Sequence, residues 1–376
     1  MELHDLVPVL TAPGPFVTVH VGSESDVEQA ADKYELEWKN ILAELGGKGV
    51  DEPTLQAISA AKGAHDDGAS RLVVASTGDA DVKIAVSLSA PPRRPVVDVA
   101  PLPHLLPLIE DVSTRVPYVL VVADRTGADV SAFYDAEHVA DEVTVLGRRT
   151  HERGPARGSW KHIYHEFPAE QVWMNRIAHD IVEGVTQLAR DVSAELVIGA
   201  GDVRVLSAIS DELPTDLKPR WCTVEGGRGQ DGSDRLIEQR VRDTLSRHVV
   251  TKSLDLLEDY AQERGQVKRA CEGVADVVAA LRKAQVQTLL VTTAAPDDAT
   301  LWFGPDATAV AETAAELRDL GVTEPEQGPL VDVLIRAAVA TGADVQLVPH
   351  QLDTAPNGGV GALLRYADGD NAAARS

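Results

Sequence analysis

The chain has 376 residues, of which 44% are hydrophobic and 25% charged, and a formal net charge of −24. This length predicts two or three domains, and the acidic balance argues against general nucleic-acid binding because phosphate repels an acidic surface. The sequence shows no membrane span, no signal-peptide pattern, and no disulfide or metal spacing in its 2 cysteines. These features indicate a reduced, cytoplasmic protein.

The first segment, residues 1–113, is predicted to be an α/β domain. Apolar alternation and helical spacing predict a strand at 14–21, helices at 26–45 and 53–64, and strands at 71–75 and 82–88. The prolines between 91 and 103 are expected to break the pattern before the apolar stretch 105–112. No motif in this segment carries chemistry.

The second segment, residues 114–250, opens with two strands at 118–124 and 127–133. The link from Asp124 to Gly127 has the chemistry of a hairpin turn. The following order is a basic loop at 147–165, a helix at 170–190 and a buried strand at 195–199. The polar tract 225–234 is predicted to be a loop before a helix at 235–260.

The third segment, residues 251–376, alternates helix and strand. Helices are predicted at 267–284, 307–320 and 329–341, and strands at 288–292, 344–348 and 360–366. This pattern predicts a three-layer α/β/α domain. The whole chain is therefore expected to be α/β in class.

The basic loop is the strongest functional signal in the residues themselves. Residues 147–165 hold five Lys/Arg against Glu152 alone, a net charge of +4 in an acidic chain. Arginine grips phosphate in a bidentate manner, glycine lets a backbone approach closely, and aromatic rings stack on exposed bases. A solvated surface loop is the alternative. The predicted RNA-binding residues are Arg148, Arg149, His151, Arg153, Arg157, Ser159, Trp160, Lys161 and His162.

Other candidate sites have simpler explanations. Asp124, Asp129 and Asp202 could hold Mg²⁺ in a nuclease, but a hairpin turn and a helix cap explain them better. The partial dinucleotide fingerprint at 199–204 lacks its third glycine, so a tight strand-to-helix turn is favoured.

Three further signals are weak. The run 226–230 separates its glycine pair from Gln230 by an inserted Arg-Gly and is interpreted as a linker. Cys222 is expected to be buried rather than reactive. His162 and His165 could ligate zinc, but they lack the nearby carboxylate or cysteine residues that are expected in a zinc site. No catalytic residue, metal or cofactor is predicted.

Several motifs together resemble one family. They are Gly14-Pro-Phe16, Pro117-Tyr118, Asp124-Arg-Thr-Gly-Ala-Asp129, Met174-Asn-Arg176 and Gly359-Val-Gly-Ala-Leu-Leu-Arg-Tyr366. With the order hairpin, basic loop, long helix and buried strand, the chain resembles the bacterial branch of the archaeo-eukaryotic class I release factor and Pelota superfamily. It is most similar to the actinobacterial Balon-like ribosome hibernation factors.

The resemblance implies a ribonuclease-H-like middle domain and a C-terminal domain like the kink-turn-binding ribosomal proteins. It also implies binding to the 70S ribosome at the rRNA of the A site and the peptidyl transferase centre, during stress. Elongation factor Tu is an implied partner of the C-terminal domain.

The loop departs from true release factors. Gly154-Pro-Ala-Arg-Gly158-Ser159 stands where the family carries Gly-Gly-Gln-Ser, so a non-catalytic occupant of the ribosome is expected. The alternatives are a peptide-release or peptidyl-tRNA hydrolase with an atypical loop, and a Pelota-like adaptor that rescues stalled ribosomes.

Overall fold

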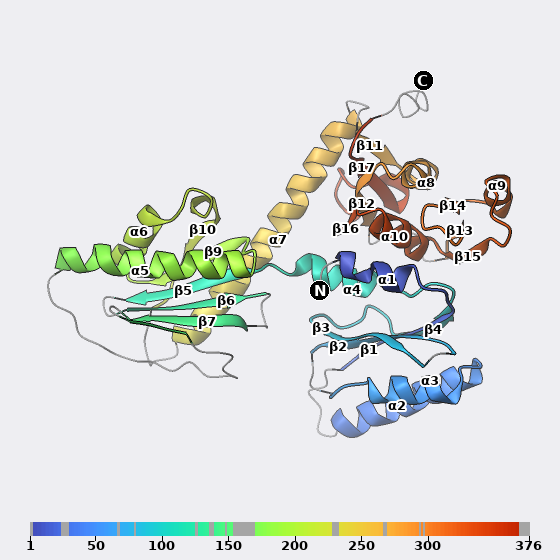
Figure 1. Ribbon diagram of the computed structural model, residues 1–376, viewed down its shortest axis with the longest axis horizontal. Helices are drawn as coiled ribbons and strands as arrows, with labels where there is room; N and C mark the ends of the chain where they lie inside the picture. The colour runs from blue at the N-terminus through green and yellow to red at the C-terminus, as the bar shows by residue number, and fades with distance from the viewer. Residues whose placement is uncertain are drawn as a thin grey trace. The chain divides into compact units, whose positions relative to one another are not determined.

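The computed structural model describes residues 3–23, 30–65, 68–78, 80–124, 127–134, 139–146, 149–152, 170–227, 233–265, 269–292, 295 and 298–367. Two compact units form, one from Met1–Ser113 with Leu254–Ser376 and one from Thr114–Ser253. Both combine helices with sheets (Figure 1), which confirms the predicted α/β class. The division into three domains stays a prediction. Within the described ranges, no helix has both the length and the apolar character needed to cross a membrane.

A six-stranded sheet forms the centre of the second unit. Its strand order is β10-β9-β5-β6-β7-β8, in which β5, β9 and β10 are parallel and the other neighbours are antiparallel. The strands are β5 (Tyr118–Asp124), β6 (Gly127–Phe133), β7 (Val139–Leu146), β8 (Arg149–Glu152), β9 (Leu196–Gly201) and β10 (Trp221–Val224). The predicted hairpin is therefore confirmed as β5 and β6.

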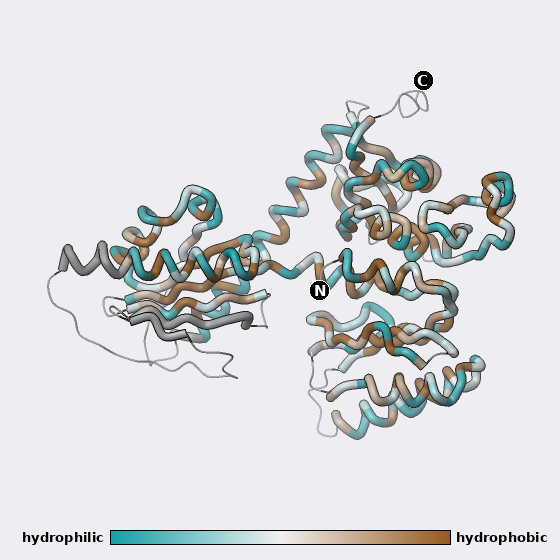
Figure 2. Tube along the Cα trace, in the orientation of Figure 1, coloured by the Kyte–Doolittle hydropathy of each residue, from teal (hydrophilic) through white to brown (hydrophobic). Residues whose placement is uncertain are grey.

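Helices cover both faces of this sheet, because successive residues of a strand point to opposite faces. Val119 and Val121 of β5 pack with α5 (Glu170–Asp191) and α6 (Val203–Glu212). Leu120 and Val122 pack with the first half of α7 (Ser233–Gly265). Figure 2 shows hydrophobic residues along the central strands. The second unit is thus a three-layer α/β/α structure.

The N-terminal part of the first unit is built on an antiparallel sheet of order β3-β2-β1-β4. Val17 and Val19 point to one face, towards the helical layer that includes Trp38, and Phe16 points to the other face. The strands are β1 (Phe16–Gly22), β2 (Ser70–Ser76), β3 (Val82–Leu88) and β4 (Val96–Ala100), and the helices are η1 (Leu3–Leu6), α1 (Val7–Leu10), α2 (Ala30–Gly47), α3 (Glu52–Ala60) and α4 (Leu106–Thr114). Strand β4 was not predicted, because the prolines around it were expected to break any regular structure. Pro95 and Pro101 instead lie just outside its two ends, where a proline does not disturb the pairing of the strand.

The C-terminal part of the first unit holds two sheets. The larger has the order β11-β17-β12-β16, and the smaller has the order β14-β13-β15. The strands are β11 (Ala270–Glu272), β12 (Val286–Thr292), β13 (Thr300–Phe303), β14 (Val310–Ala311), β15 (Glu326–Pro329), β16 (Asp344–Val348) and β17 (Val360–Leu364). The helices are α8 (Val274–Arg282), α9 (Ala314–Asp319) and α10 (Leu330–Ala340), and 3₁₀ turns lie at η2 (Lys218–Arg220) in the second unit and η3 (Asn357–Gly359) here.

Two predicted helices of this part were wrong at their beginnings. Part of the region 267–284, which was expected to be helical, forms strand β11. Helix α8 begins only after Gly273, whose backbone φ of 85° is rarely adopted by residues that carry a side chain. The helix expected at 307–320 contains β14, and α9 begins after Thr313, whose hydroxyl accepts the N–H of Glu316. Strand β11 pairs with β17, some 90 residues later, whereas β14 pairs with β13, which ends seven residues before it, and helical spacing reveals neither pairing.

The N-terminal and C-terminal parts of the first unit share one hydrophobic core. Leu6 and Leu10 pack in the same cluster as Val333 and Val339 of α10. At this junction Arg336 is only 4% exposed, and its Nε donates to the Leu10 carbonyl at 3.1 Å. The same guanidinium donates to the Pro305 carbonyl at 2.8 Å. One buried cation therefore joins segments 326 residues apart.

Replacement of Arg336 by Met should destabilise the protein by roughly 2–4 kcal/mol, since buried carbonyl acceptors would lose their donor. Urea unfolding of the full chain measures this difference. Arg318→Met is the control, because Arg318 is exposed on α9, and its effect should stay within about 0.5 kcal/mol. Equal stabilities of the two variants would contradict the structural role of Arg336.

Candidate functional site

The β5–β6 hairpin is closed by an aspartate. The Oδ1 atom of Asp124 accepts the backbone N–H of Gly127 at 3.0 Å, which is local turn chemistry. Asp202 similarly caps α6, accepting the N–H of Arg204 at 2.9 Å. In the described part of the chain, no group of three or more His, Cys, Asp or Glu residues could hold a metal ion. The turn and cap interpretations of these two aspartates are therefore confirmed.

The strand-to-helix turn after β9 depends on two glycines. Gly201 has φ of 125°, and a Cβ there would lie 1.8 Å from the Ala123 carbonyl oxygen. A Cβ on Gly199 would lie 2.5 Å from the Trp221 ring. The glycines are thus explained by close packing of β9 against β5 and Trp221, and the predicted tight turn from strand to helix is confirmed, since β9 ends at Gly201 and α6 begins at Val203.

Gly201→Ala should lower the free energy of unfolding by roughly 2–4 kcal/mol, because both the backbone conformation and the space exclude a methyl group. Chemical denaturation at neutral pH measures the loss. Gly227→Ala is a matched control, since a Cβ at Gly227 meets nothing within 4 Å. A Gly201 variant as stable as the control would show that the turn tolerates a side chain.

The predicted basic loop begins differently from expectation. Residues Arg149–Glu152 form strand β8, which pairs with β7 in the register Leu146↔Arg149 and Val143↔Glu152. Within the region 147–165, residues Arg149–Glu152 are thus a strand rather than a loop. A sequence signal existed, since only Gly147 and Arg148 separate the two strands and a glycine in a two-residue link favours a hairpin.

The predicted RNA-binding residues fall into two groups. Arg149 and His151 lie on the backbone of β8. The others lie outside the described residues, and they are Arg148, Arg153, Arg157, Ser159, Trp160, Lys161 and His162. Strand β8 lies within the basic segment and α5 begins at Glu170, after it, and the RNA contacts of the segment stay predictions.

Cys222 lies on the edge strand β10 and is half-buried. Burial raises the pKa of its thiol, and the nearby charge of Arg247 only partly opposes this. A thiol with a raised pKa stays protonated at neutral pH and is a poor nucleophile. Cys222 was expected to be buried rather than reactive; it is only half-buried, and its raised pKa is consistent with low reactivity.

Glu195 joins the sheet to α7. Its carboxylate lies 2.9 Å from Nζ of Lys252 and 3.1 Å from Nε2 of His248. Burial alone would raise the pKa of Glu195, but the hydrogen bonds from Lys252 and His248 outweigh it, and the pKa is lowered. The folded protein therefore favours the ionised carboxylate.

The lowered pKa predicts a pH-dependent contribution to stability. It is present above the ordinary glutamate pKa of 4.5 and is lost as the pH falls through the lower folded value. Glu195→Gln should therefore lower the free energy of unfolding at pH 7, by up to about 1 kcal/mol because the carboxylate is partly exposed to solvent. The loss should become progressively smaller below pH 4.5. Urea titrations at several pH values measure this. Glu225→Gln, in a side chain 85% exposed, is the control. A cost for Glu195→Gln that does not change with pH would contradict the account.

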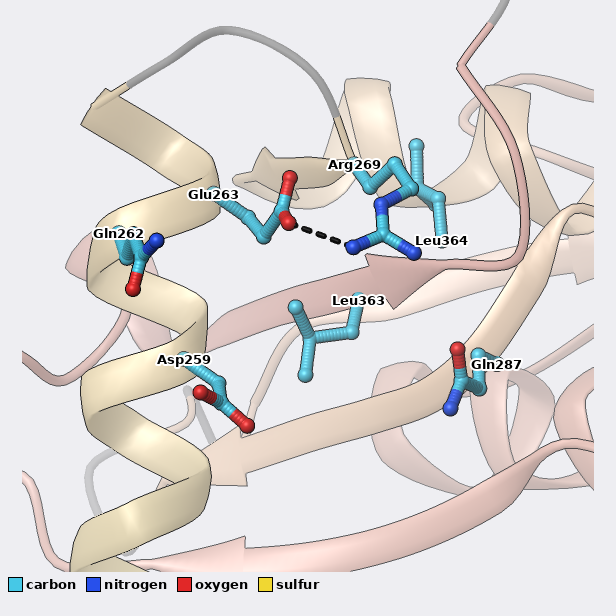
Figure 3. Close-up of a pocket in the computed structure, with 7 residues that line it drawn as sticks. All are labelled: Asp259, Gln262, Glu263, Arg269, Gln287, Leu363 and Leu364. Atoms are coloured by element: carbon cyan, nitrogen blue, oxygen red, sulfur yellow. Dashed lines mark hydrogen bonds and ion pairs between the residues drawn. The ribbon is translucent and has the colours of Figure 1, made fainter.

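A shallow hollow lies where the end of α7 meets the C-terminal sheet (Figure 3). Its volume is about 220 Å³, below the roughly 300–1,000 Å³ of small-molecule pockets. The Arg269 guanidinium points at Glu263, 2.6 Å away, and this hydrogen bond raises the pKa of Arg269. The remaining lining residues are Asp259, Gln262, Gln287, Leu363 and Leu364. The charges of this pair offset each other, so the hollow does not support a small-molecule site.

A known protein family matches most of the second unit. Residues 117–266, which run from the start of β5 through α7, match the profile of the bacterial archaeo-eukaryotic release factor family 2. This segment is therefore similar to the bacterial branch of the archaeo-eukaryotic release factors. The resemblance carried by the hairpin, the long helix and the buried strand is thereby confirmed at the level of the superfamily.

Relatives also match along most of the chain. The uncharacterized protein Rv2629 of Mycobacterium tuberculosis strain H37Rv is 28% identical over 371 residues, which cover 96% of this chain and 95% of that protein. The uncharacterized protein MT2704 of strain CDC 1551 gives the same values, 28% over 371 residues.

Among solved structures, Pelota of Archaeoglobus fulgidus is similar with a TM-score of 0.33 and 14% identity over 79% of each chain. Dom34 of S. cerevisiae is similar with a TM-score of 0.38 and 12% identity, covering 80% of this chain and 82% of that one.

Proposed function

We propose that the protein is a ribosome-binding translation factor that occupies the A site without hydrolysing peptidyl-tRNA. The observation that carries this proposal is the match of residues 117–266 to the bacterial release factor family. The basic segment 147–165, net +4 in a chain of net −24, supports contact with rRNA phosphates.

The loop sequence supports occupancy rather than hydrolysis. The chain contains no Gly-Gly-Gln tripeptide, and Gly154–Ser159 reads Gly-Pro-Ala-Arg-Gly-Ser. Release factors use the glutamine and its backbone amide to position water at the ester, and proline at 155 has no N–H to offer. A factor lacking these groups would block aminoacyl-tRNA entry while leaving the peptidyl-tRNA ester intact.

The finer role that we propose is ribosome hibernation, as in Balon-like factors. In this role rRNA phosphates near the peptidyl transferase centre are contacted by Arg148, Arg149, Arg153, Arg157 and Lys161. The base-stacking groups are Trp160, His151 and His162. Elongation factor Tu would bind the C-terminal part of the chain, and the protein would act in the cytoplasm. A rescue adaptor would share the binding and differ in the ribosomes that it meets.

The proposal predicts stoichiometric binding of the full chain to vacant 70S ribosomes in sedimentation assays. The double variant Arg153→Gln/Arg157→Gln should bind more weakly, and the slope of log Kobs against log salt should fall by about 2, because two phosphate contacts are lost. Arg190→Gln/Arg204→Gln changes the net charge equally on exposed positions of α5 and α6 and should keep the slope. Equal slopes for the two double variants would contradict the loop contacts.

The same samples test hydrolysis. Ribosomes carrying peptidyl-tRNA in the P site should retain the ester when the protein is bound. Release of the peptide would make the protein a hydrolase with an atypical loop. If the wild-type chain does not sediment with ribosomes at all, the proposed function is wrong.

A further inference from the structure

The first half of α7 has a buried face and an exposed face. Ile237, Val241 and Leu245 are spaced four residues apart and pack on the six-stranded sheet. On the opposite side Leu236 is 43% exposed and Val250 is 58% exposed. This side is an open helix surface on the second unit, opposite the layer of α5 and α6.

The exposed side of the first half of α7 is basic. Residues 235–252 hold five Lys/Arg against two Asp/Glu, a net charge of +3. Two pairs of arginines lie seven residues apart, so each pair forms a row along the helix. We call these four residues the α7 basic face: Arg235 with Arg242, and Arg240 with Arg247. Asp243 lies between the rows.

The helical layer on the other side of the sheet, formed by α5 and α6, has a negative net charge. The described side chains of α5, residues 178–191, and of α6, residues 203–212, hold five Asp/Glu against two Lys/Arg, a net charge of −3. All of these charged side chains are exposed. The second unit therefore presents one acidic and one basic layer on the two sides of a single sheet, and a polyanion would meet the α7 side.

Three arginines of the α7 basic face make weak local contacts to other described residues. Nη2 of Arg240 is 3.6 Å from Glu225, and Nη2 of Arg242 is 3.9 Å from Glu238. Exposed pairs at such distances contribute little, roughly 0–1 kcal/mol. Arg247 donates to the Asp243 carbonyl and the Thr244 hydroxyl of its own helix. A phosphate that accepts two N–H groups from a guanidinium would displace these contacts readily.

We propose that the α7 basic face is a second RNA-contact surface, which binds the phosphate backbone of rRNA. This inference rests on the proposed function as a ribosome binder. From Arg235 to Arg247 the helix rises about 18 Å, which is several phosphate steps of a nucleic-acid strand. Because the guanidinium groups approach phosphates, the contact positions the second unit without reading base sequence.

The experiment uses the full chain and purified 70S ribosomes at a series of salt concentrations. The test variants are Arg240→Gln/Arg247→Gln and Arg235→Gln/Arg242→Gln, one for each row. Arg190→Gln/Arg204→Gln, on the acidic layer, removes the same charge and controls for net-charge effects. The expected result is weaker binding by each α7 variant, with a decrease of about 1 in the salt slope for each arginine that contacts phosphate, and no decrease for the control.

Four outcomes would overturn the proposal. Equal effects of the α7 variants and the control would mean that only net charge matters. Weaker binding with an unchanged salt slope would assign the α7 basic face to a protein partner. Normal binding by the α7 variants, with weakened binding by Arg153→Gln/Arg157→Gln, would leave the proposed function standing and reject the α7 contact. A wild-type chain that does not bind ribosomes rejects both.

Discussion

Electrostatic repulsion between phosphate and a chain of net −24 is the constraint on which any RNA-binding account of this protein depends. Such a chain can approach RNA only where it gathers positive charge and turns its acidic surfaces away. The second unit has the architecture for this separation. A sheet buried on both faces keeps the acidic helices α5 and α6 apart from the first half of α7, whose exposed side is basic.

Helix α7 connects several properties of the molecule. Its first half closes the core of the second unit through Ile237 and Val241, and its last turns close the sheet that contains β17 through Leu257 and Tyr260. Glu195 holds the helix from the sheet side through Lys252 and His248. The exposed arginines are therefore displayed on a helix whose buried face is fixed by packing and by an ion-paired carboxylate.

The sequence correctly predicted the elements whose structure depends on residues close together in the chain. The hairpin at Asp124–Gly127, the cap at Asp202 and the helix α10 all follow from neighbouring residues. The elements that were missed depend on partners distant in sequence. Strand β11 pairs with β17 some 90 residues later, and β13 pairs with β15 more than 20 residues later, so that no nearby residue signals these two pairings.

The candidate RNA-binding surfaces also divide into one that the sequence predicted and one that it did not. Clustered arginines made the segment 147–165 visible in the sequence as a basic loop, although Arg149–Glu152 extend the sheet as an edge strand. The α7 basic face was not predicted. Its four arginines are mixed with Glu238 and Asp243 in the sequence, and they separate from the buried residues only when the helix packs on the sheet.

The most direct test of the central claim is electron cryomicroscopy of the full chain bound to the 70S ribosome. The account predicts that residues 147–165 reach the peptidyl transferase centre, that the α7 basic face lies against rRNA phosphates, and that the acidic layer of α5 and α6 faces away from RNA. A complex with α5 and α6 against rRNA and α7 in solvent would contradict it.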